Sequence, residues 1–177
     1  MNIRSAALED LPAIVEIYNQ SIPGRLATAD TEPVTLADKL DWFHQRPPNR
    51  PLWVIEQQHR VAGWLSFQNF YGRPAYRHTA EISLYIATAY QHQGLGSRLL
   101  QQAIADATQL ELKTLLAFIF DHNQPSLKLF ANFGFVTWGN LPDVAELDCV
   151  ARSLKILGLK IIQRQFDENL EKVKAEI

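Results

Sequence analysis

Two glycines stand in the segment Gln91-His92-Gln93-Gly94-Leu95-Gly96, between an alternating apolar stretch and an amphipathic one. Glycine lets the main chain approach a ligand closely and adopt conformations that a Cβ atom disfavours. The N–H groups in the first turn of a helix have no partner within the helix, and the helix dipole adds partial positive charge there. The pattern therefore predicts that main-chain amides bind an anion such as a pyrophosphate.

The glycine turn also has other interpretations. A dinucleotide-binding fingerprint needs a third glycine where Leu99 stands, although Asp121 follows the next apolar strand, where a ribose-binding acid would lie. Several residues also separate Ile86 from Gly94, whereas that fingerprint follows its strand directly. A Walker A loop needs Lys-Ser/Thr where the sequence has Ser97-Arg98. A glycine pair taken alone favours a plain loop, so the rest of the chain must decide.

The composition limits how an anion is held. The chain has 177 residues, of which 47% are hydrophobic and 20% charged, and a formal net charge of −2, which fits one globular domain. Because the balance is slightly acidic, we expect neither a nucleic-acid nor a membrane partner. A phosphate group must then be bound by local geometry.

The sequence favours a cytosolic protein without a metal. Arg4, Glu9 and Asp10 interrupt any signal-peptide hydrophobic segment. The apolar run 115–120 is far shorter than the roughly 20 residues that span a bilayer. Cys149 is the only cysteine, so an intramolecular disulfide is impossible. No metal-ligand spacing links the histidines His44, His59, His92 and His122.

Hydrophobic spacing predicts one mixed α/β domain over 1–160 and an amphipathic helical extension over 161–177. The predicted helices cover 9–20, 35–45 and 94–109, and a fourth follows Asn123 as its N-cap and ends at Gly134. The predicted strands are 2–5, the hairpin 52–56 and 61–67, then 79–86, 115–120, a strand beginning at 135–138, and 147–157. In 79–86, Glu81, Ser83 and Tyr85 share one face of the strand, opposite Ala80, Ile82, Leu84 and Ile86.

The order Gln-x-x-Gly-x-Gly after a strand resembles the acetyl-CoA signature of the GCN5-related N-acetyltransferase (GNAT) superfamily. Downstream, Asn123-Gln-Pro-Ser126-Leu-Lys-Leu-Phe130-Ala-Asn-Phe-Gly134-Phe135 resembles the helix-strand signature of the same superfamily. The resemblance implies the GNAT acyl-CoA N-acyltransferase fold. That fold has a central mixed, mostly antiparallel sheet, splayed at the acetyl-CoA site and flanked by helices.

Four segments are similar to the phosphinothricin and methionine-sulfone acetyltransferase branch of this superfamily. The most specific is Tyr76-Arg77-His78-Thr79-Ala80-Glu81-Ile-Ser83-Leu-Tyr85-Ile86, and the others are 16–19, 30–34 and 42–43. The branch implies a homodimer that transfers acetyl from acetyl-CoA to the primary amine of a small amino-acid-like molecule. It also places a proposed catalytic carboxylate at Glu81.

The resemblance further implies which residues bind acetyl-CoA. The main chain of the strand would pair with the pantetheine arm, the glycine turn would hold the pyrophosphate, and the start of the next helix would contact either group. The expected cofactor-binding residues are Leu84, Tyr85, Ile86, Gln91, His92, Gln93, Gly94, Leu95, Gly96, Ser97, Asn123 and Ser126.

The implied reaction explains why a carboxylate is needed. Primary amines have pKa values of about 8 to 10, so they are mostly protonated at neutral pH. Only the neutral amine attacks a thioester, and Glu81 would remove the proton directly or through a water. An amide of the adjoining strand would stabilise the oxyanion. Without the resemblance, Glu81 would be interpreted as a residue on the solvent face of a half-exposed strand.

Phe130 departs from the superfamily pattern, which has tyrosine, or in this branch usually histidine, at the position thought to protonate the departing thiolate. Phenylalanine cannot donate a proton. Water then supplies it, the thiolate leaves unaided with a pKa near 8.5, or turnover is slow. Phe130 also keeps open a non-catalytic acyl-CoA-binding protein, and acetylation of a peptide or polyamine is a further alternative.

The candidate substrate-binding residues Arg73, Tyr76 and Arg77 directly precede the strand that carries Glu81. An arginine could pair with the carboxylate of an amino-acid substrate, and Arg25 offers the same chemistry. Trp42 is a candidate for the wall of the acceptor pocket. A solvated loop and a core aromatic residue are the alternatives for these positions.

Overall fold

The computed structural model describes residues 2–161. One seven-stranded sheet has the strand order β1-β2-β3-β4-β5-β7-β6, and only β4 and β5 pair in parallel. The strands are β1 (Asn2–Ser5), β2 (Leu52–Gln57), β3 (Arg60–Asn69), β4 (Thr79–Ile86), β5 (Thr114–Phe120), β6 (Val136–Leu147) and β7 (Val150–Lys160). The helices are α1 (Leu11–Ser21), α2 (Leu36–His44), α3 (Leu95–Asp106) and α4 (Gln124–Asn132).

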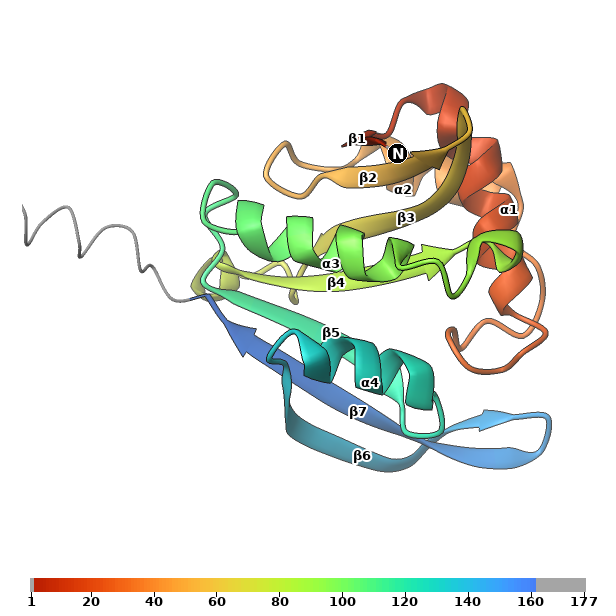
Figure 1. Ribbon diagram of the computed structural model, residues 1–177. Helices are drawn as coiled ribbons and strands as arrows, with labels where there is room; N and C mark the ends of the chain where they lie inside the picture. Colours follow the sequence, from red (N-terminus) through yellow and green to blue (C-terminus); the bar gives the residue numbers. More distant parts are fainter. Residues whose placement is uncertain (1, 162–177) are drawn as a thin grey trace, which may run out of the picture.

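Helices α3 and α4 lie over one face of the sheet (Figure 1). The apolar stripe predicted for α3 is buried there, with Leu95, Leu99, Leu100 and Ala103 at most 1% exposed. A second cluster joins the sheet to α1 and α2, and its buried members are Ile14, Ile17, Leu52, Val54, Trp64 and Ala87. The two clusters use opposite faces of the same strands, as the alternation along β4 requires.

Local chemistry fixes the ends of the helices. The Thr35 hydroxyl accepts the amide of Asp38 and the Asp38 carboxylate accepts the amide of Thr35, which starts α2 with a capping box. The Asn123 side chain accepts the amide of Ser126 and caps α4, as predicted. Gly134 follows α4 with φ +86°, a conformation that favours glycine.

The parallel pair of β4 and β5 is short. Its registered pairs run only from Thr79↔Thr114 to Glu81↔Leu116, while β4 pairs with β3 as far as Ile86 and β5 pairs with β7 as far as Phe120. Beyond Glu81 the two strands therefore separate, and Figure 1 shows the sheet opening between them. The predicted mixed, mostly antiparallel and splayed sheet is confirmed.

The last part of the sheet differs from the prediction. The last strand, expected over 147–157, is found as β7, but its bounds are shifted, because Leu147 ends β6 and β7 runs from Val150 to Lys160. The turn residues Asp148 and Cys149 both have positive φ, as a two-residue hairpin turn of type I′ requires. Most of β6 is exposed and its register with β7 shifts twice, so its sequence carries no regular alternation.

Two sequence predictions remain, one on the C-terminal helix and one on membrane-spanning segments. The helix predicted over 161–177 lies outside the described residues apart from its first position, so the division at residue 160 stays a prediction. No helix among the described residues is long and apolar enough to cross a membrane.

Candidate active site

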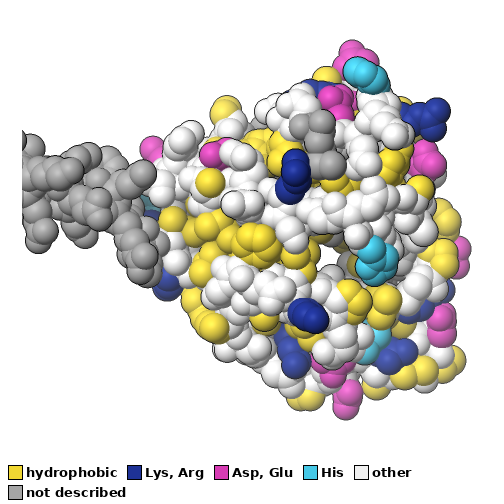
Figure 2. All heavy atoms as spheres, in the orientation of Figure 1, with side chains coloured by type: hydrophobic (Ala, Val, Ile, Leu, Met, Phe, Trp, Pro, Cys, Tyr) yellow, Lys and Arg dark blue, Asp and Glu magenta, His cyan; other side chains and the backbone are white. Residues whose placement is uncertain are grey.

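The opening between β4 and β5 holds a cavity of about 450 Å³. Its walls are residues 81–85 of β4 and 117–120 of β5, with Ser126 and Phe130 of α4 and the loop 26–29. In the space-filling view, a hollow and a band of hydrophobic side chains mark the seam between the two parts of the sheet (Figure 2). The cavity is thus bounded by strands that lack a partner on the side that faces it.

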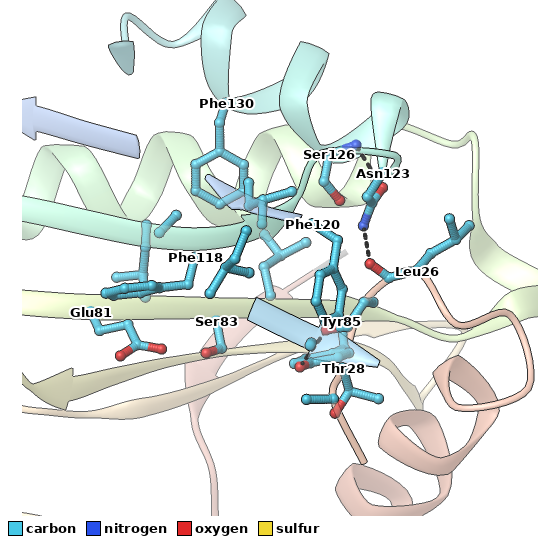
Figure 3. A pocket seen from close by; sticks show the side chains of 18 of the residues that line it. Leu26, Thr28, Glu81, Ser83, Tyr85, Phe118, Phe120, Asn123, Ser126 and Phe130 are labelled. Atoms are coloured by element: carbon cyan, nitrogen blue, oxygen red, sulfur yellow. Dashed lines mark hydrogen bonds between the residues drawn. The ribbon is translucent and has the colours of Figure 1, made fainter. Parts of the chain in front are cut away.

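Glu81 stands where this cavity begins. Figure 3 shows Glu81 and Ser83 side by side on β4, with their oxygens pointing the same way. The Glu81 carboxylate is half-buried and forms no hydrogen bond or ion pair with residues 2–161. Burial raises the pKa of Glu81 above its ordinary value, because the charged form loses solvation. A carboxylate in this setting accepts a proton more readily than one in water.

The main chain of β4 offers hydrogen-bonding groups to the cavity. The Ala87 amide donates to Ala62 of β3, and bonded pairs alternate along an antiparallel ladder. The polar groups of Tyr85 therefore belong to the β3 ladder, whereas those of Leu84 and Ile86 point toward the side that β5 has left. An extended ligand arm placed there can pair with β4 as a strand would.

The glycine turn lies at the wide end of the opening. Gly94 has φ +79° and precedes α3, and His92 also has positive φ. Within residues 2–161, the main-chain N–H groups from His92 to Ser97 donate no hydrogen bond. A Cβ atom on Gly96 would lie 3.3 Å from Leu129 and 3.5 Å from Leu84. The turn therefore presents unpaired main-chain donors where α3 packs closely on Leu84 and Leu129, and such donors suit an anion site.

Side chains within the glycine turn are partly used by the protein itself. Gln91 Nε2 donates to the Ile86 carbonyl at 3.4 Å, and Gln93 Nε2 donates to the Ala89 carbonyl at 3.1 Å. Gln57 donates to Gln93 Oε1 at 3.0 Å. These bonds fix the shape of the turn and leave its main-chain amides as donors for a ligand, together with the side chains of His92 and Ser97.

The loop after α1 closes one side of the cavity. Asn123 Nδ2 donates to the Leu26 carbonyl at 3.0 Å, and the Tyr85 hydroxyl donates to the Ala27 carbonyl at 3.1 Å (Figure 3). His122 Nε2 lies 2.8 Å from the Arg25 carbonyl. Three residues from distant parts of the chain thus hold this loop against the opening.

Comparison with known proteins agrees with an acyl-CoA site at this opening. Residues 11–135 match the Acetyltransferase (GNAT) family. YwnH of Bacillus subtilis (strain 168), provisionally named a phosphinothricin acetyltransferase, is 51% identical over 162 residues, which cover 91% of this chain and 99% of that protein. The chain belongs to the GNAT acetyltransferase family.

A further relative supports the branch of the family, and a solved structure supports the fold. The L-methionine sulfoximine/L-methionine sulfone acetyltransferase of Salmonella typhimurium is 31% identical, with 96% of each chain covered. The solved structure of yncA from Salmonella typhimurium with its cofactor acetyl-CoA has a TM-score of 0.86 at 29% identity, covering 92% of this chain and 94% of that one. The resemblance to the phosphinothricin and methionine-sulfone branch is confirmed.

In this GNAT enzyme, Phe130 is 4% exposed and packs edge to face on Phe135, with ring centroids 5.0 Å apart. Figure 3 shows its ring directed toward the cavity from α4. Ser126, one helical turn earlier, lines the same cavity. The wall near the expected thiolate position is therefore an aromatic ring without a proton donor, next to a hydroxyl.

Other predicted residues of the enzyme lie elsewhere. Arg73, Tyr76 and Arg77 belong to the segment between β3 and β4 and do not line the cavity beside Glu81, so their binding of substrate stays a prediction. Arg25 forms an ion pair with Asp148 at 2.9 Å. Among the described residues, no three His, Cys, Asp or Glu side chains gather as metal ligands, and a metal-free site stays a prediction.

Sequence reasoning missed the loop 26–29 and Phe118 as parts of the cavity wall. Leu26 and Ala27 take part through their carbonyl groups, which every residue type carries. No sequence signal could have identified them.

Proposed function

We propose that the chain is an acetyl-CoA-dependent N-acetyltransferase that acts on the primary amine of a small amino-acid-like molecule. The observation that carries the proposal is the position of Glu81. Its half-buried carboxylate stands at the point where β4 and β5 part. A proton acceptor is thereby placed at the end of a cavity that suits an acyl-pantetheine arm.

Several features of the chain fit acetyl-CoA. The main-chain groups of Leu84 and the amide of Ile86 suit the amides of pantetheine, and the unpaired amides from His92 to Ser97 suit the pyrophosphate. Asn123 keeps a second amide proton beyond the one donated to Leu26, and Ser126 adds a hydroxyl. These contacts remain predictions for the residues that bind the cofactor.

The proposed chemistry is direct transfer. Acetyl-CoA supplies an acetyl thioester. Glu81 receives the proton of the amine, directly or through a water, because its raised pKa brings it closer to that of the amine. The amine nitrogen then forms a bond to the acetyl carbon, the carbon–sulfur bond breaks, and the nitrogen releases its second proton to water to give the amide. Phe130 offers no proton, so the thiolate leaves unprotonated, which its ordinary pKa near 8.5 permits, or takes a proton from water.

The names of the relatives suggest the acceptor class. The Salmonella relative is named for methionine sulfoximine and methionine sulfone, and the Bacillus relative is provisionally named for phosphinothricin. These acceptors share an α-amino acid unit and a short side chain that ends in a polar phosphorus or sulfur group. We propose the same class for this chain.

The test is release of free thiol from acetyl-CoA by the purified protein, with phosphinothricin, methionine sulfone and methionine sulfoximine as acceptors. We expect turnover that Glu81→Gln strongly reduces and that Glu9→Gln, at an exposed position, leaves unchanged. Turnover only with a peptide or a polyamine would overturn the acceptor class. Binding of CoA without turnover on any amine would instead indicate a non-catalytic protein.

We also propose a cytoplasmic homodimer. Exposed apolar residues gather on the edge strand β6, where Val136, Trp138 and Leu141 are 58%, 45% and 39% exposed. A second copy would cover this surface, since clustered exposed apolar residues mark interaction sites. Light scattering of the eluted protein tests the mass, and a monomer at micromolar concentration would overturn the dimer.

A further inference from the structure

A second, smaller cavity of about 180 Å³ lies between the sheet and the helices α1 and α2. Ser83 and Tyr85 line both this cavity and the larger one between β4 and β5. The face of β4 that carries Glu81 therefore also faces this smaller space. Neither cofactor binding nor proton transfer, as described above, uses it.

Aromatic rings form the walls of the second cavity. Trp64 stacks on Tyr85 with centroids 4.5 Å apart, Trp42 meets Trp64 at 6.0 Å, and Tyr18 meets Tyr85 at 5.1 Å. The polar atoms of Trp64, Tyr18 and Tyr85 already have partners, the Tyr85 hydroxyl through the Ala27 carbonyl. Trp64 Nε1 donates to the Ile14 carbonyl, and the Tyr18 hydroxyl donates to Asp30. What the rings of Trp64, Tyr18 and Tyr85 present to a ligand is therefore apolar surface.

Lys39 is the one cationic side chain among the residues that line this cavity. Its ammonium lies 4.8 Å from the centroid of the Tyr18 ring and 5.9 Å from that of Trp42. Lys39 is half-buried on a helix whose other residues are mostly exposed, and it forms no ion pair within residues 2–161. An ammonium held over aromatic faces keeps its charge available for an anion.

The second cavity reaches the proposed base. Gln68 lines it and stands directly across from Glu81 in the β3–β4 register. Opposed residues on neighbouring strands have Cβ atoms about 5 Å apart. Ser83, two residues along the same face, joins the space beside Glu81 to the aromatic walls. A molecule whose amine lies at Glu81 can therefore extend into this cavity.

We propose that this cavity is the acceptor subsite, in which Lys39 binds an oxyanion carried on a short apolar stem. This inference rests on the proposed N-acetyltransferase function and specifies its substrate class. The aromatic walls contact the stem, and the ammonium pairs with a carboxylate or phosphinate oxygen. The Gln68 amide and the Ser83 hydroxyl are available for further polar contacts.

The test is a comparison of steady-state kinetics for wild type, Lys39→Met and Lys39→Arg. Methionine keeps the length of the stem and removes the charge. We expect Lys39→Met to raise the KM for phosphinothricin about tenfold or more, since a lost charged hydrogen bond has this effect, and Lys39→Arg to restore much of it. The dissociation constant of CoA is expected to stay unchanged. Lys113→Met, at an exposed position beyond α3, is the matched control.

Two acceptor pairs distinguish the source of the oxyanion. If Lys39 binds the α-carboxylate, wild type should have a higher KM for the α-methyl ester of each amino acid than for the free acid. Lys39→Met should then have similar KM values for the acid and the ester. If Lys39 binds the side-chain group, Lys39→Met affects phosphinothricin and spares methionine sulfone, which has no net charge on its side chain. Either pattern supports the subsite.

Two results overturn the inference in different ways. If wild type transfers acetyl to these amino acids and Lys39→Met has the same KM for all of them, the subsite is wrong and the proposed function stands. If wild type acetylates none of them, the proposed acceptor class fails and the subsite fails with it. Thermal unfolding of Lys39→Met at the wild-type temperature excludes a folding defect.

Discussion

Glu81 faces Leu116 in the last registered pair between β4 and β5. On one side of this pair the strands are joined by the parallel ladder, and on the other they diverge around the larger cavity. The carboxylate therefore stands at the vertex of the opening, beside the end that an acyl group would reach. Cross-strand to it, Gln68 leads into the aromatic cavity. One residue thus borders both spaces.

Glu81→Gln is predicted to lower kcat by about 10²- to 10⁴-fold, the range typical of a lost general base. Glutamine keeps the size of the side chain but cannot accept the proton. The affinity for CoA is expected to change little, as isothermal titration would measure. A mutant with kcat within twofold of wild type would exclude Glu81 as the base.

The wild-type pH profile follows from the raised pKa of Glu81. The base must be ionised, so kcat is expected to rise with pH along a limb whose midpoint lies above the ordinary glutamate pKa of 4.5. The stability effect has the opposite sign. Between the unfolded and folded pKa values, the unfolded state loses its proton first, so stability falls as pH rises. Glu81→Gln should therefore be more stable than wild type at neutral pH, and this gain should vanish below pH 4.5 in chemical denaturation.

The sequence predicted the parts of the site that depend on residue type and short spacing. The strand 79–86 and the capping role of Asn123 are found as expected, because alternation and helix capping are local effects. The loop 26–29 could not be predicted as a wall of the cavity. Its contacts with Tyr85 and Asn123 span 58 and 97 residues and use main-chain carbonyls.

Gly94 is predicted to matter for the stability of the turn, and Gly96 for CoA binding. Gly94→Ala meets no atom within 4 Å but must adopt φ near +79°, which costs about 1–2 kcal/mol of stability. Gly96→Val places carbons against Leu129 and Leu84 and so displaces the first turn of α3, which carries the unpaired amides. We expect it to weaken CoA binding by roughly tenfold, or about 1.4 kcal/mol.

Denaturant unfolding and CoA titration measure these two effects. Gly24→Ala is the matched control, because its Cβ atom would lie at an ordinary 3.8 Å from the nearest atom, and it should change neither quantity. CoA binding by Gly96→Val at wild-type affinity would show that the first turn of α3 does not hold the cofactor.

Asn123 is predicted to have two separable roles. Its side-chain oxygen caps α4, and its Nδ2 group holds the Leu26 carbonyl. Asn123→Ala removes both and is expected to cost about 1–2 kcal/mol. Asn123→Asp keeps the cap acceptor but cannot donate to Leu26, so it should spare α4 and release the loop.

Hydrogen exchange measured by mass spectrometry distinguishes these outcomes. Faster exchange in the peptide covering 25–30, with unchanged exchange in α4, is expected for Asn123→Asp. Equal protection of the loop in both variants and in wild type would mean that Tyr85 and His122 hold it without Asn123.

The ion pair between Arg4 and Asp10 is predicted to stabilise the start of the chain against α1. Arg4 donates to Asp10 Oδ2 at 2.6 Å and to Glu56 at 2.6 Å, and the Ala7 amide donates to Asp10 at 2.8 Å. Hydrogen bonds from the Arg4 guanidinium hold the pKa of Asp10 below its ordinary value of 3.8. Asp10 is 8% exposed, so solvent screens this pair only in part. Asp10→Asn should therefore cost about 1–3 kcal/mol at neutral pH.

The pH dependence of this cost has a definite sign. Because the folded pKa of Asp10 is lowered, its contribution is complete above the unfolded value of 3.8 and is lost as pH falls through the folded value. The difference in unfolding free energy between wild type and Asp10→Asn should therefore shrink below pH 3.8. Asp41→Asn, on the exposed face of α2, should show no such trend. Equal stability of Asp10→Asn and wild type at pH 7 would mean that the Arg4–Glu56 contact alone anchors β1.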